Sequence, residues 1–265
     1  MKKVKIEAIG VKKVFIDENT GREIVAIENI SLKVYEHEFA VLIGPSGAGK
    51  STFLYLIAGF EKPTRGQIFL DGRPITEPGP DRGIVFQEYV LFPWKTVLGN
   101  VMFGLELNGY PKEEAVKRAM KYIKLVGLQG FEHAYPHTLS GGMKQRVAIA
   151  RALAYDPEVL LMDEPFGSLD AQTRMLLVDD LARIHVETGK TVVFVTHNVE
   201  EALLLADRIF IFSARPSRII KVVKIPYEKP RQPHDERLLA LRKQILDILR
   251  EEVRKMINRE IKGFP

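Results

Sequence analysis

The sequence predicts an α/β fold with a mostly parallel sheet core, an N-terminal antiparallel β layer and an inserted helical subdomain. Wholly apolar runs such as FAVLIG and VLLMD are typical of strands that are covered on both faces. Helical patterns alternate with these runs, as they do in parallel α/β sheets. Between about residues 91 and 156 the pattern is helical, which indicates an insertion.

The strands and helices follow in a regular order. The first forty residues and the segment GQIFLDGRPI alternate in polarity and carry the turn signal Asp71-Gly72, so we expect an antiparallel layer there. The segment KEEAVKRAMKYIKLVGL has apolar residues at helical spacing, with Gly127 as its stop. Three prolines precede a final helix that begins at about Glu236. The strands of the parallel core are expected at 39–44, 83–87, 159–163, 191–197 and 208–214.

Size and composition fit a globular protein with a sizeable core. The 265 residues are 46% hydrophobic, enough for one large domain or a domain with an inserted subdomain. The N-terminus lacks the apolar run of a secretion signal, and no stretch of about 18 apolar residues is present, so we predict a cytoplasmic chain. Because the chain has no cysteine, disulfides and thiolate metal sites are excluded.

Charge is concentrated at the C-terminus. The 12 Lys and Arg and 7 Asp and Glu residues from position 221 onward account for the whole net charge of +5. The rest of the chain is neutral and has no basic stripe with interleaved aromatic residues, so we expect no nucleic-acid partner.

A glycine-rich segment after the first buried strand predicts phosphate binding. GPSGAGKST follows the strand FAVLI and opens a helix, which is the context of a P-loop. Backbone N–H groups of such a loop surround the β-phosphate, Lys50 reaches the β- and γ-phosphates, and Ser51 can bind Mg²⁺. The alternative is a glycine-rich turn that binds nothing. The predicted ATP-binding residues here are Gly44, Pro45, Ser46, Gly47, Ala48, Gly49, Lys50, Ser51 and Thr52.

Two carboxylates end the buried strand VLLMD. Asp163 is the expected Mg²⁺ ligand, and Glu164 is expected to orient or deprotonate the attacking water. The alternative is that these acids cap the next helix. Their position after a P-loop favours the catalytic interpretation.

Three single residues are weaker candidates. Gln87 ends the strand GIVFQ and could contact Mg²⁺ or the water, or be an ordinary loop glutamine. His197 ends TVVFVTH and could hydrogen-bond the γ-phosphate, or cap the next helix. Phe15 could stack on adenine, or belong to the β-rich core.

A second phosphate-binding segment is predicted at LSGGMKQRVAIARAL. Ser140, Gly141 and Gly142 stand at the start of a long helical run, where N–H groups and the positive end of the helix dipole gather. The alternative is a serine that caps an ordinary helix.

Together, GPSGAGKST, Gln87, LSGGMKQR, VLLMDEP, GSLD and His197 resemble, in this order, the nucleotide-binding subunit of ATP-binding cassette (ABC) transporters. The resemblance covers about residues 5–225 and implies a P-loop NTPase of the RecA-like class with ATP and Mg²⁺ as cofactors. It also implies a head-to-tail pair, in which Ser140, Gly141 and Gly142 contact the γ-phosphate held by a second copy. Asp170 of GSLD resembles the residue that crosses the dimer interface.

The resemblance divides the chain into three parts. Residues 1–90 and 157–225 would form the nucleotide-binding core with the antiparallel layer, and residues 91–156 the helical subdomain that carries LSGGM. Residues 226–265 would form a C-terminal helical extension, which could pack on the domain, on a partner or at anionic lipid. Of these three, packing on the same chain is the favoured interpretation.

Among ABC subunits, the chain looks most like the branch that imports nitrate, sulfonates, taurine and bicarbonate. Pro93-Trp94 and Arg215-Pro216 weigh most in this comparison. The resemblance implies an integral membrane permease, an extracytoplasmic solute-binding protein and a peripheral location at the cytoplasmic face of the membrane. Phe92 and Trp94 would face the permease, although Trp94 buried in the helical subdomain is an alternative.

Other functions fit less well. An exporter or another importer branch is the main competitor. A soluble ABC ATPase of DNA repair or translation would require a coiled-coil insertion or a second cassette, and a small-molecule kinase would have no use for LSGGM. The chain departs from the family pattern at His37, Ser168 and Asn198, where glycine, alanine and aspartate are usual.

Overall fold

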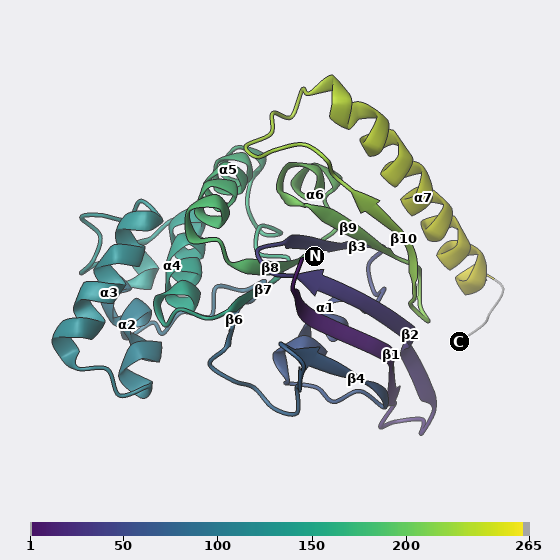
Figure 1. Cartoon of the computed structure of the whole chain (residues 1–265), viewed down its shortest axis with the longest axis horizontal. Coiled ribbons are helices and arrows are strands. Elements are labelled where there is room, and N and C mark those ends of the chain that lie inside the picture. The colour runs from purple at the N-terminus through teal and green to yellow at the C-terminus, as the bar shows by residue number, and fades with distance from the viewer. Residues whose placement is uncertain (1, 262–265) are drawn as a thin grey trace. The chain divides into compact units, whose positions relative to one another are not determined.

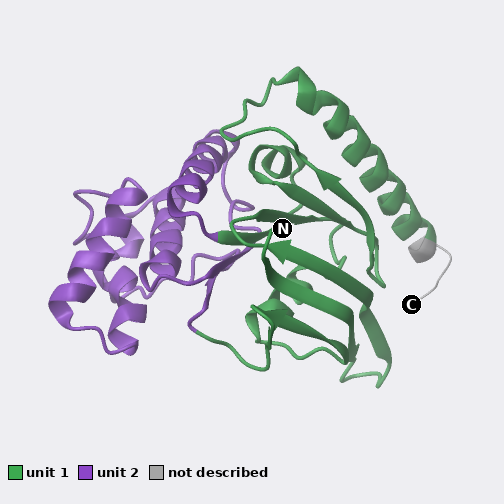
Figure 2. Cartoon of the chain, viewed as in Figure 1, with its two compact units in different colours: residues 1–79, 191–265 green, residues 80–190 purple. Residues whose placement is uncertain are grey.

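The structure, a computed structural model, describes residues 2–261, with side chains through Asn258 (Figure 1). The chain forms two compact units (Figure 2). The first consists of residues 1–79 and 191–265, and the second of residues 80–190. Each unit has its own buried apolar core.

The first unit contains the predicted antiparallel layer. Its strands are β1 (Val4–Ile16), β2 (Glu23–Tyr35), β4 (Arg65–Leu70) and β5 (Arg73–Pro74), in the order β2-β1-β4-β5. Ala8 of β1 pairs with Leu32 of β2 and with Ile68 of β4. Asp71 and Gly72 have φ values of 46° and 75°, as a tight hairpin turn requires.

A second sheet of the first unit is largely parallel. β3 (Phe39–Ile43) lies between β8 (Thr191–Thr196) and β9 (Arg208–Phe212), and both neighbours run parallel to it. β10 (Ile219–Lys224) pairs antiparallel with β9. Every residue of β3 and β8 is buried, which explains the apolar run of β3 and the apolar residues between Thr191 and Thr196 of β8. The turn before β3 is closed by His37, whose φ is 63° and whose N–H donates to Thr191 Oγ1 at 3.0 Å.

The described part of this unit also contains the helices α1 (Lys50–Ala58), α6 (Val199–Leu205) and α7 (Glu236–Ile261). α7 begins at the predicted residue and packs against α6. Leu238 and Ile245 of α7 are buried, and Arg242 of α7 forms an ion pair of 2.6 Å with Glu200 of α6. The C-terminal extension therefore packs on its own chain, as the sequence favoured.

The second unit combines two strands with helices. β6 (Arg82–Val85) and β7 (Val159–Asp163) are parallel, with Ile84 opposite Leu161. The helices are α2 (Val97–Leu107), α3 (Lys112–Leu125), the short 3-10 helix η1 (Pro136–Thr138), α4 (Gly141–Ala154) and α5 (Ala171–Thr188). α3 ends two residues before Gly127, whose φ is 70°, so the predicted stop is confirmed.

The helices α2, α3 and α4 pack on one another, within the range where the sequence predicts a helical subdomain. The compact unit is larger than that range, because it also holds β6, β7 and α5. The functional division into core, helical subdomain and extension stays a prediction. None of the helices within residues 2–261 combines the length and apolar character that crossing a bilayer requires.

Candidate functional site

The P-loop connects β3 to α1 and depends on glycine geometry. Gly47 and Gly49 have φ values of 72° and 74°, a region that other residues enter only with strain. Gly49 is the N-cap of α1, and no described side chain caps this helix. A helix start built from backbone and glycine is the usual cradle for a phosphate group.

At Gly44 and Gly49, neighbouring backbone lies so close that a larger residue would not fit without a shift. A Cβ on Gly44 would lie 2.8 Å from the carbonyl oxygen of Phe212, at the end of β9. A Cβ on Gly49 would lie 3.1 Å from the carbonyl oxygen of Ala26. The loop therefore packs closely against β9 and β2, and these contacts constrain its conformation.

Lys50 points back across this loop. It is 4% exposed, and its Nζ donates to the carbonyl oxygens of Gly44 at 3.0 Å and Pro45 at 2.8 Å. The ammonium group thus lies within the turn, where it adds a positive charge to the N-terminus of α1.

His197 follows β8 and is exposed. The alternative that it caps α6 is wrong, because Asn198 is the N-cap. The Asn198 Oδ1 accepts from the N–H groups of Glu200 at 2.8 Å and Glu201 at 3.4 Å. Asparagine thus replaces the usual aspartate as a cap of equal quality. The catalytic role of His197 stays a prediction.

Phe15 lies near the end of β1, opposite Ile24 of β2, and is half-buried. Lys13 Nζ lies 4.7 Å from the centroid of its ring. A half-buried ring is partly open to a stacking partner, and the adenine contact stays a prediction.

In the second unit, β7 delivers Asp163 and Glu164. Asp163 is 4% exposed, and Glu164 is half-buried with a φ of 42°. The alternative that these acids cap α5 is wrong, because Asp170 Oδ1 accepts from the N–H groups of Gln172 and Thr173 at 3.1 and 3.0 Å. A glutamate in the left-handed region is uncommon, and such strained residues cluster at functional sites, which favours the catalytic interpretation.

Gln87 lies just beyond β6 and close to the segment that follows Glu164. A Cβ on Gly167 would lie 3.7 Å from Gln87 Nε2 and 3.4 Å from the carbonyl oxygen of Glu164. Arg174 holds this segment, since it donates to the carbonyl oxygens of Phe166 at 3.3 Å and Leu169 at 2.7 Å. The amide of Gln87 and the backbone of Glu164 therefore border the same glycine.

The LSGGM segment starts α4. Ser140 is exposed and is the N-cap, and its Oγ accepts from the N–H of Met143 at 3.3 Å. The capping interpretation is thus confirmed, but the hydroxyl keeps its own hydrogen to donate. A Cβ on Gly142 would lie 2.6 Å from Thr173 Cγ2, so α4 needs glycine to approach α5.

Asp170 resembles a residue that crosses the dimer interface, and in this structure it is an exposed helix cap. Hydrogen bonds from Thr173 and Gln172 lower the pKa of its carboxyl below the ordinary value.

Ser168 is the second position at which the chain departs from the family pattern, and its Oγ lies 3.2 Å from the hydroxyl of Tyr89.

Trp94 is 72% exposed, so the alternative that it is buried within the helical subdomain is wrong. Its ring centroid lies 5.6 Å from that of Phe92, which in turn lies 4.4 Å from Phe103. An exposed tryptophan resting on an aromatic pair is typical of a surface that receives a partner.

Sequence reasoning missed the residues that support this aromatic segment. Asn100 is fully buried in α2, and its Nδ2 donates to the carbonyl oxygens of Phe92, Lys95 and Thr96 at 3.2, 3.0 and 3.0 Å. Arg151 of α4 donates to the carbonyl oxygens of Tyr89 and Val90. The sequence feature that could have indicated this role is the asparagine among the apolar residues of α2, since a buried amide needs polar partners.

Arg215 is a second residue whose role was missed. Its Nε donates to the carbonyl oxygen of Gly47 at 3.3 Å, although the two residues are 168 positions apart. The sequence pattern singled out Arg215-Pro216 only as a resemblance to one transporter branch.

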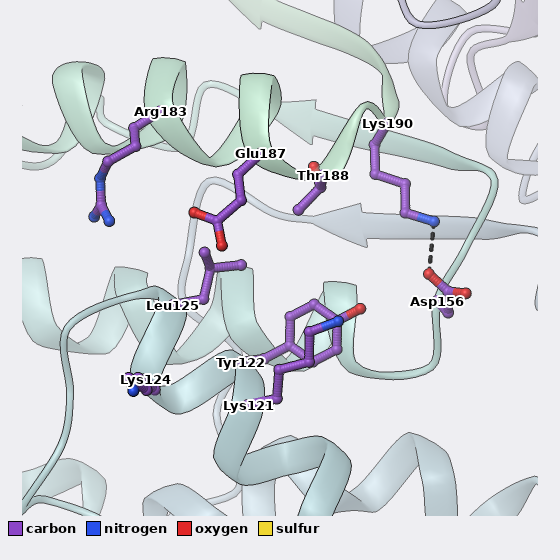
Figure 3. A pocket seen from close by; sticks show the side chains of 9 residues that line it. All are labelled: Lys121, Tyr122, Lys124, Leu125, Asp156, Arg183, Glu187, Thr188 and Lys190. Carbon is purple, nitrogen blue, oxygen red and sulfur yellow. Dashed lines mark hydrogen bonds and ion pairs between the residues drawn. The ribbon is translucent and has the colours of Figure 1, made fainter.

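A cavity of about 410 Å³ lies elsewhere in the second unit and holds none of the predicted site residues (Figure 3). Lys121, Lys124, Arg183 and Lys190 contribute cations, and Asp156 and Glu187 contribute carboxylates. Figure 3 shows Lys190 pairing with Asp156, at 2.7 Å. These mixed charges partly neutralise one another, and we assign no function to this cavity.

The predicted residues thus occupy two units. Phe15, the P-loop and His197 belong to the first unit, and Gln87, Asp163, Glu164, the LSGGM segment and Asp170 to the second. Their assembly into one site stays a prediction.

Known proteins match this chain along most of its length. Residues 27–167 match the ABC transporter family. An uncharacterized ABC transporter ATP-binding protein of Methanocaldococcus jannaschii is 54% identical over 96% of this chain and 95% of its own length. A nitrate import ATP-binding protein of Synechocystis is 48% identical over 83% of this chain and 82% of its own. A taurine import ATP-binding protein of Rhizobium johnstonii is 44% identical over 92% and 94%.

Solved structures agree with the sequence matches. A dimeric bacterial ABC transporter cassette has a TM-score of 0.74 and 35% identity, and covers 84% of this chain and 100% of its own. Its post-hydrolysis state, bound to ADP and phosphate, has a TM-score of 0.72 and 34% identity over 84% of this chain and 100% of its own. The α/β fold with an antiparallel layer is therefore that of a P-loop NTPase, and the chain belongs to the ABC transporter family as an ATP-binding and ATP-hydrolysing subunit.

Proposed function

We propose that this ATPase works as a head-to-tail pair and drives import of a small solute through a membrane permease. The observation that carries the proposal is the P-loop with Lys50 folded into its turn, in a chain whose buried strand β7 ends in Asp163 and is followed by Glu164. The names of the nitrate and taurine import relatives support the direction of transport.

The P-loop residues would hold the phosphates of ATP. Lys50 would place its charge between the β- and γ-phosphates, and Phe15 would stack on the adenine. Ser51, Asp163 and Gln87 are oxygen donors that suit Mg²⁺, and they would hold it beside the phosphates. The ion would neutralise charge on the phosphate oxygens.

Glu164 would orient the attacking water and accept its proton, because it directly follows the buried strand that also carries Asp163. His197 would donate a hydrogen bond to the γ-phosphate as negative charge develops there. These roles follow from residue chemistry and from the resemblance.

A second copy would complete the site. Ser140 is exposed at the start of α4, so its hydroxyl and the N–H groups of Gly141 and Gly142 would contact the γ-phosphate on the other copy. Asp170 would lie at the interface between the copies. Excluding water from the γ-phosphate in this way would couple closure of the pair to ATP.

The permease would dock on the surface around Phe92 and Trp94, and an extracytoplasmic solute-binding protein would deliver the solute to it. The subunit would then be peripheral, at the cytoplasmic face of the membrane. The nitrate and taurine import relatives support a small solute, for which we propose a nitrate-, sulfonate- or taurine-like anion.

Glu164→Gln tests the hydrolytic mechanism. The variant should bind ATP as wild type does, hydrolyse it at least about 100-fold more slowly, and accumulate as a dimer in ATP. Light scattering with and without ATP measures the mass, and a phosphate-release assay measures the rate. Wild-type hydrolysis by the variant would contradict the role of Glu164.

Purification from source membranes tests the transport role. A tagged chain, gently solubilised, should be recovered as two copies on an integral membrane protein, whose mass and composition identify the complex. Recovery with ribosomal proteins or nucleic acid would contradict the transporter while leaving the ATPase intact.

A further inference from the structure

The 213–218 loop, which follows β9, lies against the P-loop. Arg215 Nε donates to the carbonyl oxygen of Gly47 at 3.3 Å. Ser217 Oγ is 3.2 Å from the position of a Cβ on Gly49. Because Phe212 also approaches Gly44 from the end of β9, residues just before and within this loop contact all three P-loop glycines.

The 213–218 loop is itself firmly attached. The N–H of Ser217 donates to the carbonyl oxygen of Ala26 at 3.1 Å, and the carbonyl oxygen of Ser217 accepts from the N–H of Glu28 at 3.0 Å. Within the loop, Ser213 Oγ accepts from the N–H of Arg218 at 3.1 Å. A shift of this loop would therefore be transmitted to β2 and the P-loop rather than absorbed.

The same loop is joined to the C-terminal helix α7 by one buried carboxylate. Glu252 is 5% exposed, and its Oε2 accepts from the N–H of Ala214 at 3.0 Å. Its Oε1 accepts from Lys255 Nζ at 2.8 Å. Burial raises the pKa of the Glu252 carboxyl, but the bonds from Lys255 and Ala214 outweigh it, so the pKa lies below its ordinary value. A charged acceptor makes the bond to Ala214 a strong one.

We infer that α7 sets the position of the P-loop through Glu252 and Arg215, so that this helix controls the affinity of the chain for ATP. The connection runs from Glu252 to the N–H of Ala214, along the backbone to Arg215, and from Arg215 to Gly47. Both side chains are positioning residues, because they act on the loop rather than on the nucleotide. The inference rests on the proposed role of the P-loop as the ATP site.

Glu252→Ala tests this connection, with Glu251→Ala as the matched control. Glu251 is the preceding residue, forms an ion pair with the same Lys255, and has a side chain that is 68% exposed. Glu252→Ala leaves the buried N–H of Ala214 without its acceptor, so α7 no longer holds the 213–218 loop and the P-loop loses its position. The Kd for ATP should therefore rise about tenfold. Glu252→Gln keeps an acceptor oxygen and should restore most of the affinity. Glu251→Ala should bind as wild type does.

ATP titration calorimetry on the full chain measures the Kd, and thermal unfolding without nucleotide is recorded for each variant. A purely structural role would lower the unfolding temperature and leave the Kd of the folded protein unchanged, which would overturn the inference. If Glu252→Ala does not fold, Arg215→Ala provides the same test from the other end of the connection, because its guanidinium binds the P-loop carbonyl.

A double-mutant cycle tests whether the two residues act on one path. Glu252→Ala combined with Arg215→Ala should weaken ATP binding no more than the more severe single variant. Fully additive effects would overturn the inference. Lys50→Ala separates the two proposals: wild-type affinity in that variant would refute the P-loop as the ATP site. Lost affinity in Lys50→Ala beside wild-type affinity in Glu252→Ala would refute only the role of α7.

Discussion

The helices α1 and α4 both begin with glycine-rich segments, yet their N-termini are built in opposite ways. α1 starts after Gly49 in a left-handed conformation, and its first residue, Lys50, is buried within the preceding turn. α4 starts after Ser140, which is exposed and caps its own helix. The first arrangement would surround an anion with backbone N–H groups and a cation, whereas the second presents a helix end outward.

This difference accounts for the presence of two predicted phosphate-binding segments in one chain. The P-loop is shaped by contacts within its own unit, namely the close approaches of Phe212 and Ala26. The start of α4 contributes a hydroxyl, N–H groups and a helix dipole at an exposed position, and so suits an anion bound to another molecule. The proposed head-to-tail pair uses both properties at once.

The largest effect should come from removing the cation of the first helix start. Lys50→Ala should lower ATP hydrolysis about 100-fold or more, because a charge directed at the phosphates is lost. It should also weaken ATP binding, as measured by calorimetry. Lys144→Ala, in the first turns of α4, is the matched control and should leave binding to the isolated chain unchanged. Equal losses in both variants would remove the distinction between the two helix starts.

A smaller effect is expected at the second helix start. Ser140→Asp keeps a good N-cap, so the free energy of unfolding should change by less than about 0.5 kcal/mol. The added negative charge would repel the phosphate on the other copy, and hydrolysis should fall about tenfold or more. ATP binding to the isolated chain should not change. A loss of ATP binding at protein concentrations that exclude dimers would place Ser140 at its own chain's nucleotide.

Glycine geometry distinguishes the P-loop from an ordinary turn. Gly49 and Gly109 have nearly equal φ values of 74° and 75°, but only Gly49 has neighbours within 4 Å of a Cβ. Gly109→Ala should cost about 1 kcal/mol of unfolding free energy and spare hydrolysis. Gly49→Ala should cost more and weaken ATP binding several-fold. Chemical denaturation and calorimetry measure both quantities, and indistinguishable variants would show that crowding at Gly49 is unimportant.

The smallest effect concerns Asp170, which caps α5 as Ser140 caps α4. The pKa of its carboxyl is lowered by hydrogen bonds from Thr173 and Gln172, so the cap is weakened as the pH falls through that lowered pKa. Asp170→Asn keeps an acceptor that does not titrate. The unfolding temperature of wild type should therefore fall relative to the variant only at acid pH. If the unfolding temperatures of wild type and Asp170→Asn change in parallel down to pH values below the ordinary aspartate pKa, this titration is refuted.

The strands and helices that the sequence predicted well were those with strong local signals. The apolar runs of β3 and β8 are buried throughout, and Asp71-Gly72 and Gly127 end their elements as expected. Ser140 as a cap was also readable, since serine before a helical run is a local pattern. In each case the physical cause lies within a few residues.

The contacts that sequence reasoning missed join distant parts of the chain. Arg215 reaches Gly47 across 168 positions, and Glu252 reaches Ala214 across 38. Asn100 binds the turn around Phe92 through carbonyl oxygens, which carry no residue-specific pattern. The alternative that His197 caps α6 failed because the adjacent Asn198 is the better cap. Tertiary packing decides such contacts, and one sequence without relatives does not record it.

Trp94 is the single tryptophan of the chain, and it is 72% exposed. The intrinsic fluorescence excited at the red edge of the aromatic band therefore reports one known position, without any label. An exposed indole emits at long wavelength, and its emission moves toward the blue when a neighbour removes water from it. The protein thus carries its own optical probe of whatever approaches the Phe92–Trp94 surface, and titration with detergent-solubilised permease would convert that probe into a binding curve.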